Sequence, residues 1–185
     1  MSYIITIKQG NMLNEEDATF VVNASNTILK LGGGVSTTFK IYFGRNLQVE
    51  MDAKVQSIGE PLQKGDVVIT SAINATNFKY ILHVAIFDYN QGVDDLNKFP
   101  TLQTIADALI NIEKYLYWYT QKYNTSKLKI VLPLLGTGIG KLDKNAVAKL
   151  YKEFFSEQVD FECEVVLYGF KKTNYETLYK IFNQE

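Results

Sequence analysis

The sequence predicts an α/β fold, a three-layer αβα sandwich with a mixed, mostly parallel central sheet. Segments with the pattern of strands alternate along the chain with segments of helical periodicity, which is typical of a sheet covered by helices. Several of these strands are apolar throughout, as expected when both faces of the sheet are buried. Two neighbouring pairs of strands have no helix between them, which indicates a mixed sheet. With 185 residues, the chain is expected to form one domain, residues 1–185.

The first half of the chain is expected to supply four strands and two helices. The strands are predicted from short apolar or alternating runs, at residues 3–8, 20–23, 65–71 and 80–86. A polar turn is expected at residues 14–17. The helices are expected at residues 36–44 and 46–57, with Gly44 dividing them.

The second half begins with an expected loop at residues 87–100, which is rich in Asp and Asn and contains Gly92 and Pro100. A long helix should follow, because leucines and isoleucines from residue 102 to 116 have helical spacing and Thr101 is suited to cap it. The remaining elements are a buried strand at 129–133, a helix from Asp143, a strand at 164–170 and a helix at 173–183.

Composition excludes several classes of function. The net charge is −1 and the chain has no basic block, so strong general binding of nucleic acid is not expected. One cysteine and one histidine are too few for an internal disulfide, a zinc site or a clustered set of metal ligands. We expect Cys163 to be a small buried residue and His83 a hydrogen-bonded core residue. No signal peptide and no membrane-spanning segment is expected, so a cytoplasmic location is predicted.

A loop with two asparagines and three glycines is the first candidate site. Asn23 and Asn26 end an apolar run, and Gly32-Gly33-Gly34 then precede the helix expected at residue 36. Glycines allow a close approach of the backbone to a ligand, and the N-terminus of a helix favours a phosphate. Carboxamides both donate and accept hydrogen bonds, which suits a ribose or a nucleobase. This stretch therefore predicts a nucleotide site.

A second glycine loop, residues 135–141, follows the strand at 129–133. It differs from a phosphate-binding Walker A loop, because Lys141 is followed by Leu142 where a magnesium-binding Ser or Thr is needed. It also lacks the glycine spacing of a dinucleotide-binding fingerprint. Taken alone, a plain turn between a strand and a helix explains it equally well.

Together the two loops resemble the macrodomain family of ADP-ribose-binding modules. The resemblance rests on Asn23-x-x-Asn26, the Gly-Gly-Gly-Val run that ends at Val35, and the later Pro-x-x-Gly-Thr-Gly-Ile-Gly that begins at Pro133. The opening strand with Gly10-Asn11-Met12 and the segment 65–70 extend it over nearly the whole chain. It implies that the partner is ADP-ribose or an ADP-ribosylated macromolecule, with no cofactor.

The resemblance also implies roles for individual residues. Asn11 and Met12 would meet the adenine, although the family has an aspartate where this chain has Asn11, and the amide lacks the charge-assisted strength of a carboxylate. Asn26 would meet the distal ribose and Asn23 would orient the loop. Tyr168, or Phe170 if the register differs, would stack on the adenine. The residues expected to wrap the distal ribose and diphosphate are Gly33, Gly34, Val35, Ser36, Gly136, Thr137, Gly138, Ile139 and Gly140.

The family also contains hydrolases, and two residues are candidates for catalysis. One hydrolytic branch has an aspartate where this chain has Ser36, which argues against that mechanism. The pattern around Lys40 is similar to a glycohydrolase branch that uses a lysine nucleophile, but the acid of that branch corresponds to Gly140 here. A ring that many relatives place beside the distal ribose is also absent at Gly140, so the distal site is expected to be less enclosed.

Asn26 and Lys40 are therefore the catalytic candidates, and three functions stay open. The first is an ADP-ribose binder that also acts as an ADP-ribosyl glycohydrolase or an O-acetyl-ADP-ribose deacetylase. The second is a non-catalytic ADP-ribose reader. The third is a binder of another nucleotide phosphoester or of RNA. For Lys40, an ordinary solvated position on a helix is the alternative to catalysis.

Overall fold

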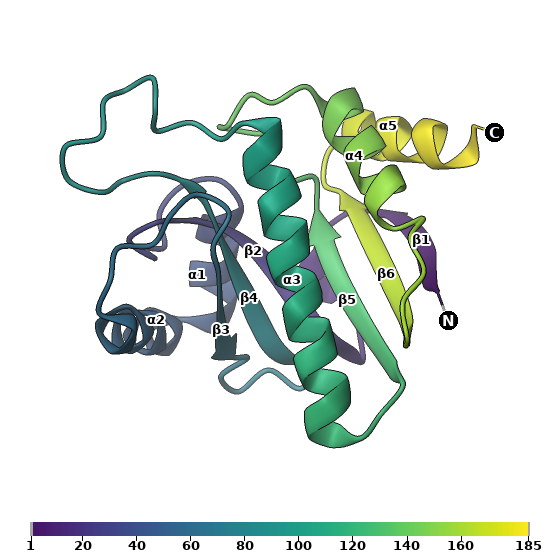
Figure 1. Ribbon diagram of the computed structural model, residues 1–185, viewed down its shortest axis with the longest axis horizontal. Coiled ribbons are helices and arrows are strands. Elements are labelled where there is room, and N and C mark those ends of the chain that lie inside the picture. Colours follow the sequence, from purple (N-terminus) through teal and green to yellow (C-terminus); the bar gives the residue numbers. More distant parts are fainter. Residues whose placement is uncertain (1, 185) are drawn as a thin grey trace.

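A computed structural model describes residues 2–184 and contains one six-stranded sheet (Figure 1). Its strand order is β1-β6-β5-β2-β4-β3. All neighbouring pairs are parallel except β3 and β4, which are antiparallel. The mixed, mostly parallel sheet predicted from the sequence is therefore confirmed. The strands are β1 (Tyr3–Gln9), β2 (Ala18–Asn26), β3 (Val67–Ser71), β4 (Phe78–Phe87), β5 (Lys127–Pro133) and β6 (Glu162–Gly169).

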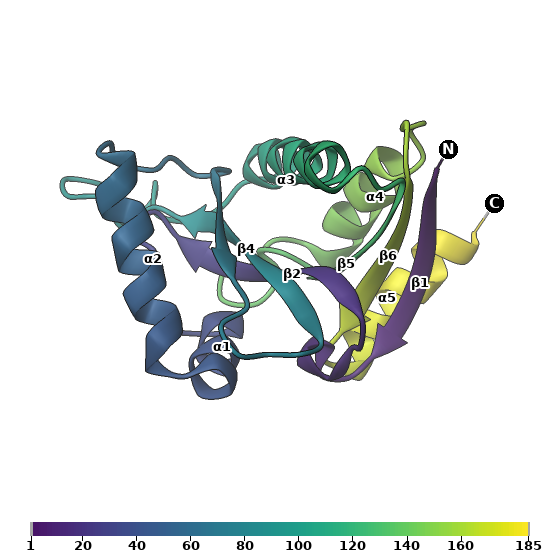
Figure 2. The same cartoon turned by 90° about the horizontal axis from the view of Figure 1, so that it is seen from below.

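Helices lie on both sides of this sheet, and Figure 2 shows α3 and α4 on the opposite side from α1. One hydrophobic core contains side chains of α3 (Leu102–Tyr123), α4 (Lys144–Phe154) and α5 (Lys172–Asn183). The second core contains side chains of α1 (Val35–Phe43), α2 (Arg45–Ile58) and a short 3-10 turn at Met12–Asn14. The predicted αβα sandwich is thus confirmed.

The central strands carry apolar residues on both faces because successive side chains enter different cores. In β2, Val22 belongs to the core under α3 and Val21 to the core under α1. In β5, Ile130 and Val131 divide in the same way. Since side chains alternate across a strand, a strand buried on both faces needs an apolar residue at every position.

The predicted elements are all present, and their ends differ from the predicted ones by a few residues. Thr101 caps α3 through a capping box with Thr104, and the Asp143 side chain caps α4. Gly44 divides α1 from α2 with a φ of 71°, a conformation that glycine adopts most readily. Strand β2 is longer than predicted, because its pairing with β4 continues through the polar residues up to Asn26. The last strand ends at Gly169, so Phe170 lies beyond it.

One side of the sheet is covered only in part. Helix α1 packs on β2 and α2 packs on β3, so the same face of β1, β6 and β5 has no helix over it. Ile4 of β1 is consequently 49% exposed. A cavity of about 760 Å³ opens there, lined by charged and aromatic side chains that include Lys127, Glu164 and Tyr123.

The free edge of β3 is capped by side chains from two helices. Asn111 of α3 donates a hydrogen bond to the carbonyl of Gly65, and the hydroxyl of Tyr115 donates to the carbonyl of Val67 at 3.1 Å. From α2, the carboxylate of Glu50 accepts from the backbone N–H of Ser71 at 2.7 Å. An uncapped edge strand invites pairing with another chain. These three side chains occupy the groups that would direct such pairing.

Cys163 lies in β6, between β1 and β5, and is fully buried as predicted. Burial raises the pKa of its thiol well above the ordinary value. Within residues 2–184, none of the helices has both the length and the apolar character that crossing a bilayer requires.

We expect Tyr115→Phe to lower the free energy of unfolding by about 1 kcal/mol, because it leaves the Val67 carbonyl without its side-chain donor. Urea denaturation measures this change. Tyr117→Phe is the matched control, since the Tyr117 hydroxyl forms no hydrogen bond with residues that the structure describes. Equal losses in the two variants would show that the cap contributes nothing.

Candidate functional site

Four buried polar side chains form a chain of hydrogen bonds beneath the first glycine loop. Ser36 donates to Asn23 at 3.1 Å, and the Asn23 amide lies 3.0 Å from Nδ1 of His83. Nε2 of His83 lies 2.9 Å from the hydroxyl of Thr70, which donates to the backbone carbonyl of the next residue. Since the Asn23 amide donates, Nδ1 of His83 must accept and Nε2 must carry the proton.

Burial lowers the pKa of His83 to about 3, so the imidazole is neutral at physiological pH. The expectation of a hydrogen-bonded core histidine is confirmed. The chain of contacts joins β2, α1, β4 and β3, because Asn23, Ser36, His83 and Thr70 come one from each of these elements. The start of α1 is thereby held at the end of β2.

Asn26 braces its own loop. Its side-chain oxygen accepts from the backbone N–H groups of Ile28 and Lys30, and its amide donates to the carbonyl of Lys30 at 2.9 Å. The turn that leads to the three glycines is therefore fixed by Asn26. Lys40, one helical turn after Ser36 in α1, is exposed to solvent.

The glycine run leaves its backbone donors free. Among the described residues, the backbone N–H groups from Gly32 to Ser36 donate to no protein acceptor. Gly34 is the N-cap of α1 and provides no side-chain cap, so the first turn of the helix also has open donors. Free donors together with the positive end of the helix dipole favour an anion.

The second glycine loop is held from below by α4. The hydroxyl of Tyr151, a fully buried residue, donates to the carbonyl of Pro133 at 2.8 Å and accepts from the N–H of Leu135 at 3.1 Å. Thr137 donates to the carbonyl of Leu134. Across the part of the chain that the structure describes, the N–H groups from Gly136 to Gly140 have no protein acceptor. A run of such groups is a second place for an anion.

The two glycine loops touch through Ile139. A Cβ atom added to Gly33 would lie 3.1 Å from Cδ1 of Ile139, and one added to Gly34 would lie 3.4 Å away. Both sets of free N–H groups therefore lie close to the same side chain, although they come from opposite ends of the sequence. The structure thus brings together Gly33, Gly34 and Ile139, as the sequence predicted for one site.

A second meeting point joins the loop after β1 to the end of β6. The N–H of Gly10 donates to the carbonyl of Gly169 at 3.1 Å, so Asn11 and Phe170 lie in adjoining loops. The side chain of Asn11 accepts from the N–H of Leu13 and caps the short 3-10 turn. Met12 is buried in this turn.

Tyr168 and Phe170, the two candidates for stacking, have different surroundings. Tyr168 is 8% exposed, and its hydroxyl donates to Glu15 at 2.7 Å. Phe170 is 73% exposed. A ring that stacks on a ligand must offer a free face, which favours the alternative candidate, Phe170.

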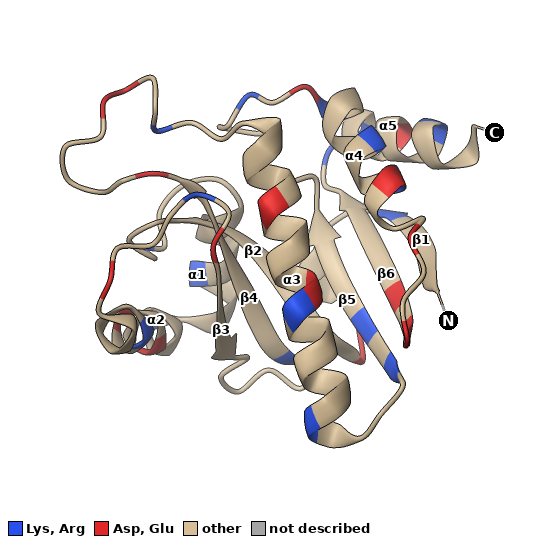
Figure 3. Cartoon of the chain, in the orientation of Figure 1, with Lys and Arg blue, Asp and Glu red and all other residues tan. Residues whose placement is uncertain are grey.

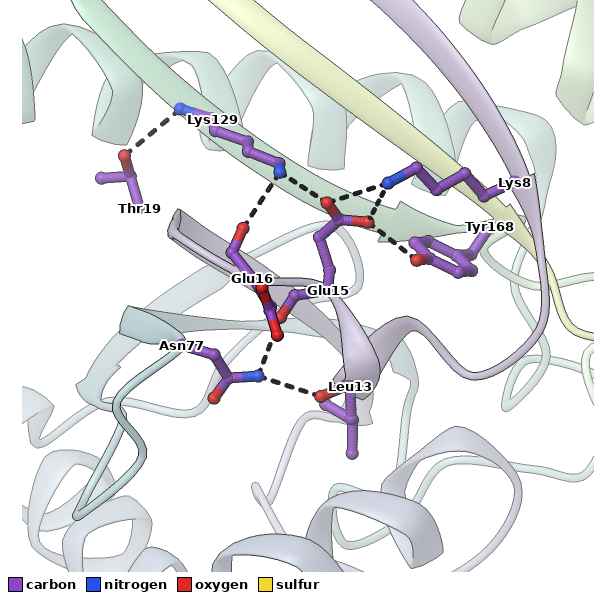
Figure 4. A network of polar contacts seen from close by, with 8 residues as sticks. All are labelled: Lys8, Leu13, Glu15, Glu16, Thr19, Asn77, Lys129 and Tyr168. Carbon is purple, nitrogen blue, oxygen red and sulfur yellow. Dashed lines mark hydrogen bonds and ion pairs between the residues drawn. The ribbon is translucent and has the colours of Figure 1, made fainter.

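Glu15 joins the loop after β1 to three strands (Figure 4). Its carboxylate is 5% exposed and accepts from Lys8 of β1, Lys129 of β5 and Tyr168 of β6. Burial alone would raise the pKa of Glu15, but these donors outweigh it and lower the pKa to about 2. The loop that carries Asn11 is therefore fastened to the uncovered end of the sheet by an ionised carboxylate.

The sequence did not reveal the supporting roles of Glu15 and Tyr151. Glu15 lies in an expected polar turn, and its partners are far from it in the sequence. Tyr151 lies on the buried, apolar face of α4, and a buried tyrosine hydroxyl usually has a hydrogen-bond partner. The sequence therefore indicated that the Tyr151 hydroxyl has a hydrogen-bond partner, but not that this partner is the second glycine loop. No group of three or more His, Cys, Asp or Glu side chains within residues 2–184 is arranged to hold a metal ion.

Comparison with known families gives a match over most of the chain. The family model described as Macro domain matches residues 22–151. An uncharacterised protein of Pyrobaculum aerophilum is 29% identical over 137 residues, which are 74% of this chain and 66% of that protein. An uncharacterised protein of Thermotoga maritima is 28% identical, with 98% of this chain and 28% of that protein aligned. The chain thus spans less than two thirds of the length of either relative.

Solved structures with the same fold are macrodomains. The Oceanobacillus iheyensis macrodomain with MES bound has a TM-score of 0.74 at 23% identity, over 96% of this chain and 89% of that one. The Trypanosoma brucei macrodomain in complex with ADP-ribose has a TM-score of 0.73 at 18% identity, over 95% of this chain and 68% of that one. At these identities the similarity establishes the shared fold.

We expect the free energy of unfolding to fall by about 2 kcal/mol between pH 7 and pH 5 through His83 alone. The unfolded histidine takes up a proton below about pH 6.5, whereas the folded one stays neutral until about pH 3. Its contribution is therefore complete above pH 6.5 and is lost as the pH falls. Glu15 contributes below this window, between its ordinary pKa of 4.5 and about 2.

Urea denaturation at pH 7 and pH 5, for the wild-type chain and His83→Gln, measures this difference. The glutamine variant should be less stable at pH 7 but should show a smaller decline at pH 5, because it cannot be protonated. The same decline in both proteins would contradict a buried neutral histidine.

Proposed function

Because this chain belongs to the Macro domain family, we propose that it binds ADP-ribose, free or attached to a macromolecule. One observation carries the proposal. The free backbone N–H groups of residues 32–36 and 136–140 meet at Ile139. A diphosphate carries two adjacent negative groups, and two neighbouring runs of free N–H donors suit that charge.

The remaining parts of ADP-ribose have candidate partners on either side of Ile139. The adenine would lie near Asn11 and Phe170, which the contact between Gly10 and Gly169 brings together. Asn11 already accepts one hydrogen bond, and the second lone pair of its oxygen is available for the exocyclic amine. The distal ribose would lie toward Asn26, which leaves one amide hydrogen free beyond its bond to Lys30.

The solved Trypanosoma brucei macrodomain in complex with ADP-ribose supports this choice of ligand. The alternative ligand is another nucleotide phosphoester, or RNA. It stays open because this chain has Asn11 where the family has an aspartate, and an amide selects adenine less strongly than a carboxylate does. ADP-ribose, ADP and AMP share the adenosine but differ in the diphosphate and the distal ribose. Their relative affinities therefore distinguish the two hypotheses.

We propose binding without hydrolysis. The Ser36 hydroxyl is engaged by Asn23 and by the carbonyl of Ala24, so it is not free to activate a water. Lys40 is exposed to water, whereas a nucleophilic lysine acts from a desolvated site. Release of ADP-ribose from a mono-ADP-ribosylated protein, lost in Asn26→Ala or Lys40→Ala, would instead establish the hydrolase hypothesis.

Calorimetry with ADP-ribose, ADP and AMP tests the proposed ligand, and we expect affinity to fall in that order. Gly138→Val should weaken ADP-ribose binding by on the order of 100-fold, the loss of two charged hydrogen bonds. A Cβ atom added at Gly138 meets no protein atom within 4 Å, so the variant should keep its thermal stability.

Gln56→Val is the matched control, because Gln56 is exposed on α2 and lies outside both glycine loops. Undetectable ADP-ribose binding by the wild-type chain would overturn the proposal. Tight AMP binding without ADP-ribose binding would favour the other nucleotide ligands.

The two aromatic candidates give a second prediction. Phe170→Ala should weaken ADP-ribose binding by about 1–3 kcal/mol, the usual contribution of a ring stacked on a base. Tyr168→Phe keeps the buried ring and removes only the hydroxyl that bonds Glu15, so it should leave the affinity unchanged. The two variants are compared by calorimetry. Unchanged affinity in Phe170→Ala would overturn the assignment of the adenine contact to Phe170.

A further inference from the structure

The loop between β4 and α3, residues 88–100, is here called the arm. Figure 1 shows it as the long segment that projects from the sheet at the end where the glycine loops lie. Loops of this length without helix or strand are uncommon in compact domains and often carry function. The proposed binding of ADP-ribose assigns no role to the arm.

Both ends of the arm are fastened to loops of the proposed site. At its start, the Thr27 hydroxyl donates to Asp88 at 3.1 Å and accepts from the N–H of Tyr89 at 2.8 Å. Thr27 directly follows Asn26. At its end, Pro100 packs on the second glycine loop, since a Cβ atom added to Gly140 would lie 2.7 Å from its ring.

Further hydrogen bonds hold the two ends of the arm together at its base. The N–H of Asp88 donates to the carbonyl of Lys98 at 2.9 Å, and the Lys64 ammonium donates to the carbonyls of Asn97 and Phe99. The arm is therefore a positioned loop beside the candidate ribose residue, with its middle part extending outward.

The arm exposes apolar and acidic side chains. Leu96, in the outer part, is 91% exposed, and Tyr89 and Phe99, at the base, are 45% and 40% exposed. The arm contains three aspartates and one lysine, and acidic colour exceeds basic colour along it in Figure 3. The single lysine, Lys98, already pairs with Asp95 at 2.6 Å.

We propose that the arm is a docking surface for the macromolecule that carries the ADP-ribosyl group, and that this macromolecule is a polypeptide with basic side chains near the modified residue. The inference rests on the proposed function, because the attached chain leaves the site at the distal ribose, beside Thr27 and the arm. Leu96 would contact an apolar side chain. Asp94 and Asp95 carry two negative charges against the one positive charge of Lys98, and the remaining charge would pair with lysine or arginine. A nucleic acid is disfavoured, because its phosphates would meet aspartates without free cations to neutralise them.

The test compares three probes by calorimetry: free ADP-ribose, a mono-ADP-ribosylated peptide rich in lysine and arginine, and a mono-ADP-ribosylated DNA oligonucleotide. The wild-type chain should bind the modified peptide about ten-fold more tightly than free ADP-ribose, the size expected from one partly buried leucine and an exposed ion pair. This gain should shrink at high salt. The oligonucleotide should show no gain.

Two arm variants test whether the higher affinity for the modified peptide comes from the arm. Leu96→Ser and the double variant Asp94→Asn with Asp95→Asn should each lose part of this gain for the modified peptide, with unchanged affinity for free ADP-ribose. Matched controls are Ile110→Ser, an exposed residue on α3, and Asp160→Asn, an exposed residue before β6. Both controls should keep the gain.

The outcomes separate the two proposals. If the wild-type chain binds no ADP-ribose, the proposed function and the docking inference both fail. If it binds free ADP-ribose and the modified peptide equally, or if the arm variants keep the gain, the docking inference alone is overturned. A gain for the oligonucleotide instead of the peptide would overturn the choice of polypeptide.

Discussion

The position of the candidate site depends on the hydrogen bonds of Asn23. This side chain accepts from Ser36 and donates to His83, and His83 in turn bonds Thr70. A buried amide without these partners would cost free energy, so each partner must stay in place. The start of α1 is thereby fixed relative to the sheet, and with it the glycines that precede the helix. The donors of the first loop are held by a network that itself lies beneath the proposed ligand contacts.

The other loops of the site are also held by side chains beneath them. Asn26 braces the first loop, Tyr151 supports the second, and Glu15 fastens the loop that carries Asn11. In each case the hydrogen bonds of a side chain hold a loop in place, and the loop exposes its backbone N–H groups to the proposed ligand. Backbone N–H groups keep the same chemistry whichever residue carries them. The proposed donors for a diphosphate therefore do not depend on Ser36 or Gly140, the positions where the resemblance implies that hydrolytic members of the family have other side chains.

Much of the fold followed from the sequence because its signals are local. Alternating and apolar runs located the strands, and Thr101 and Asp143 marked the starts of two helices. Glycine loops at strand ends indicated where the site would lie. Three features depended on contacts between distant residues and were not predictable in this way. These are the Glu15 network, the burial of Tyr168 beneath the loop after β1, and the face of β1, β6 and β5 that no helix covers. Local patterns report whether a residue is apolar, but not which loop folds over it.

The burial of Cys163 gives the chain an internal reporter of motion. Cys163 lies in β6, between the edge strand β1 and β5, and it is the only cysteine in the sequence. A thiol reagent can reach it only when the surrounding structure opens, because the folded state buries the thiol and keeps it protonated. The labelling rate under native conditions therefore reports transient openings around β1 and β6. If the loops of the site move without disturbing these two strands, ligand exchange and labelling will proceed at unrelated rates.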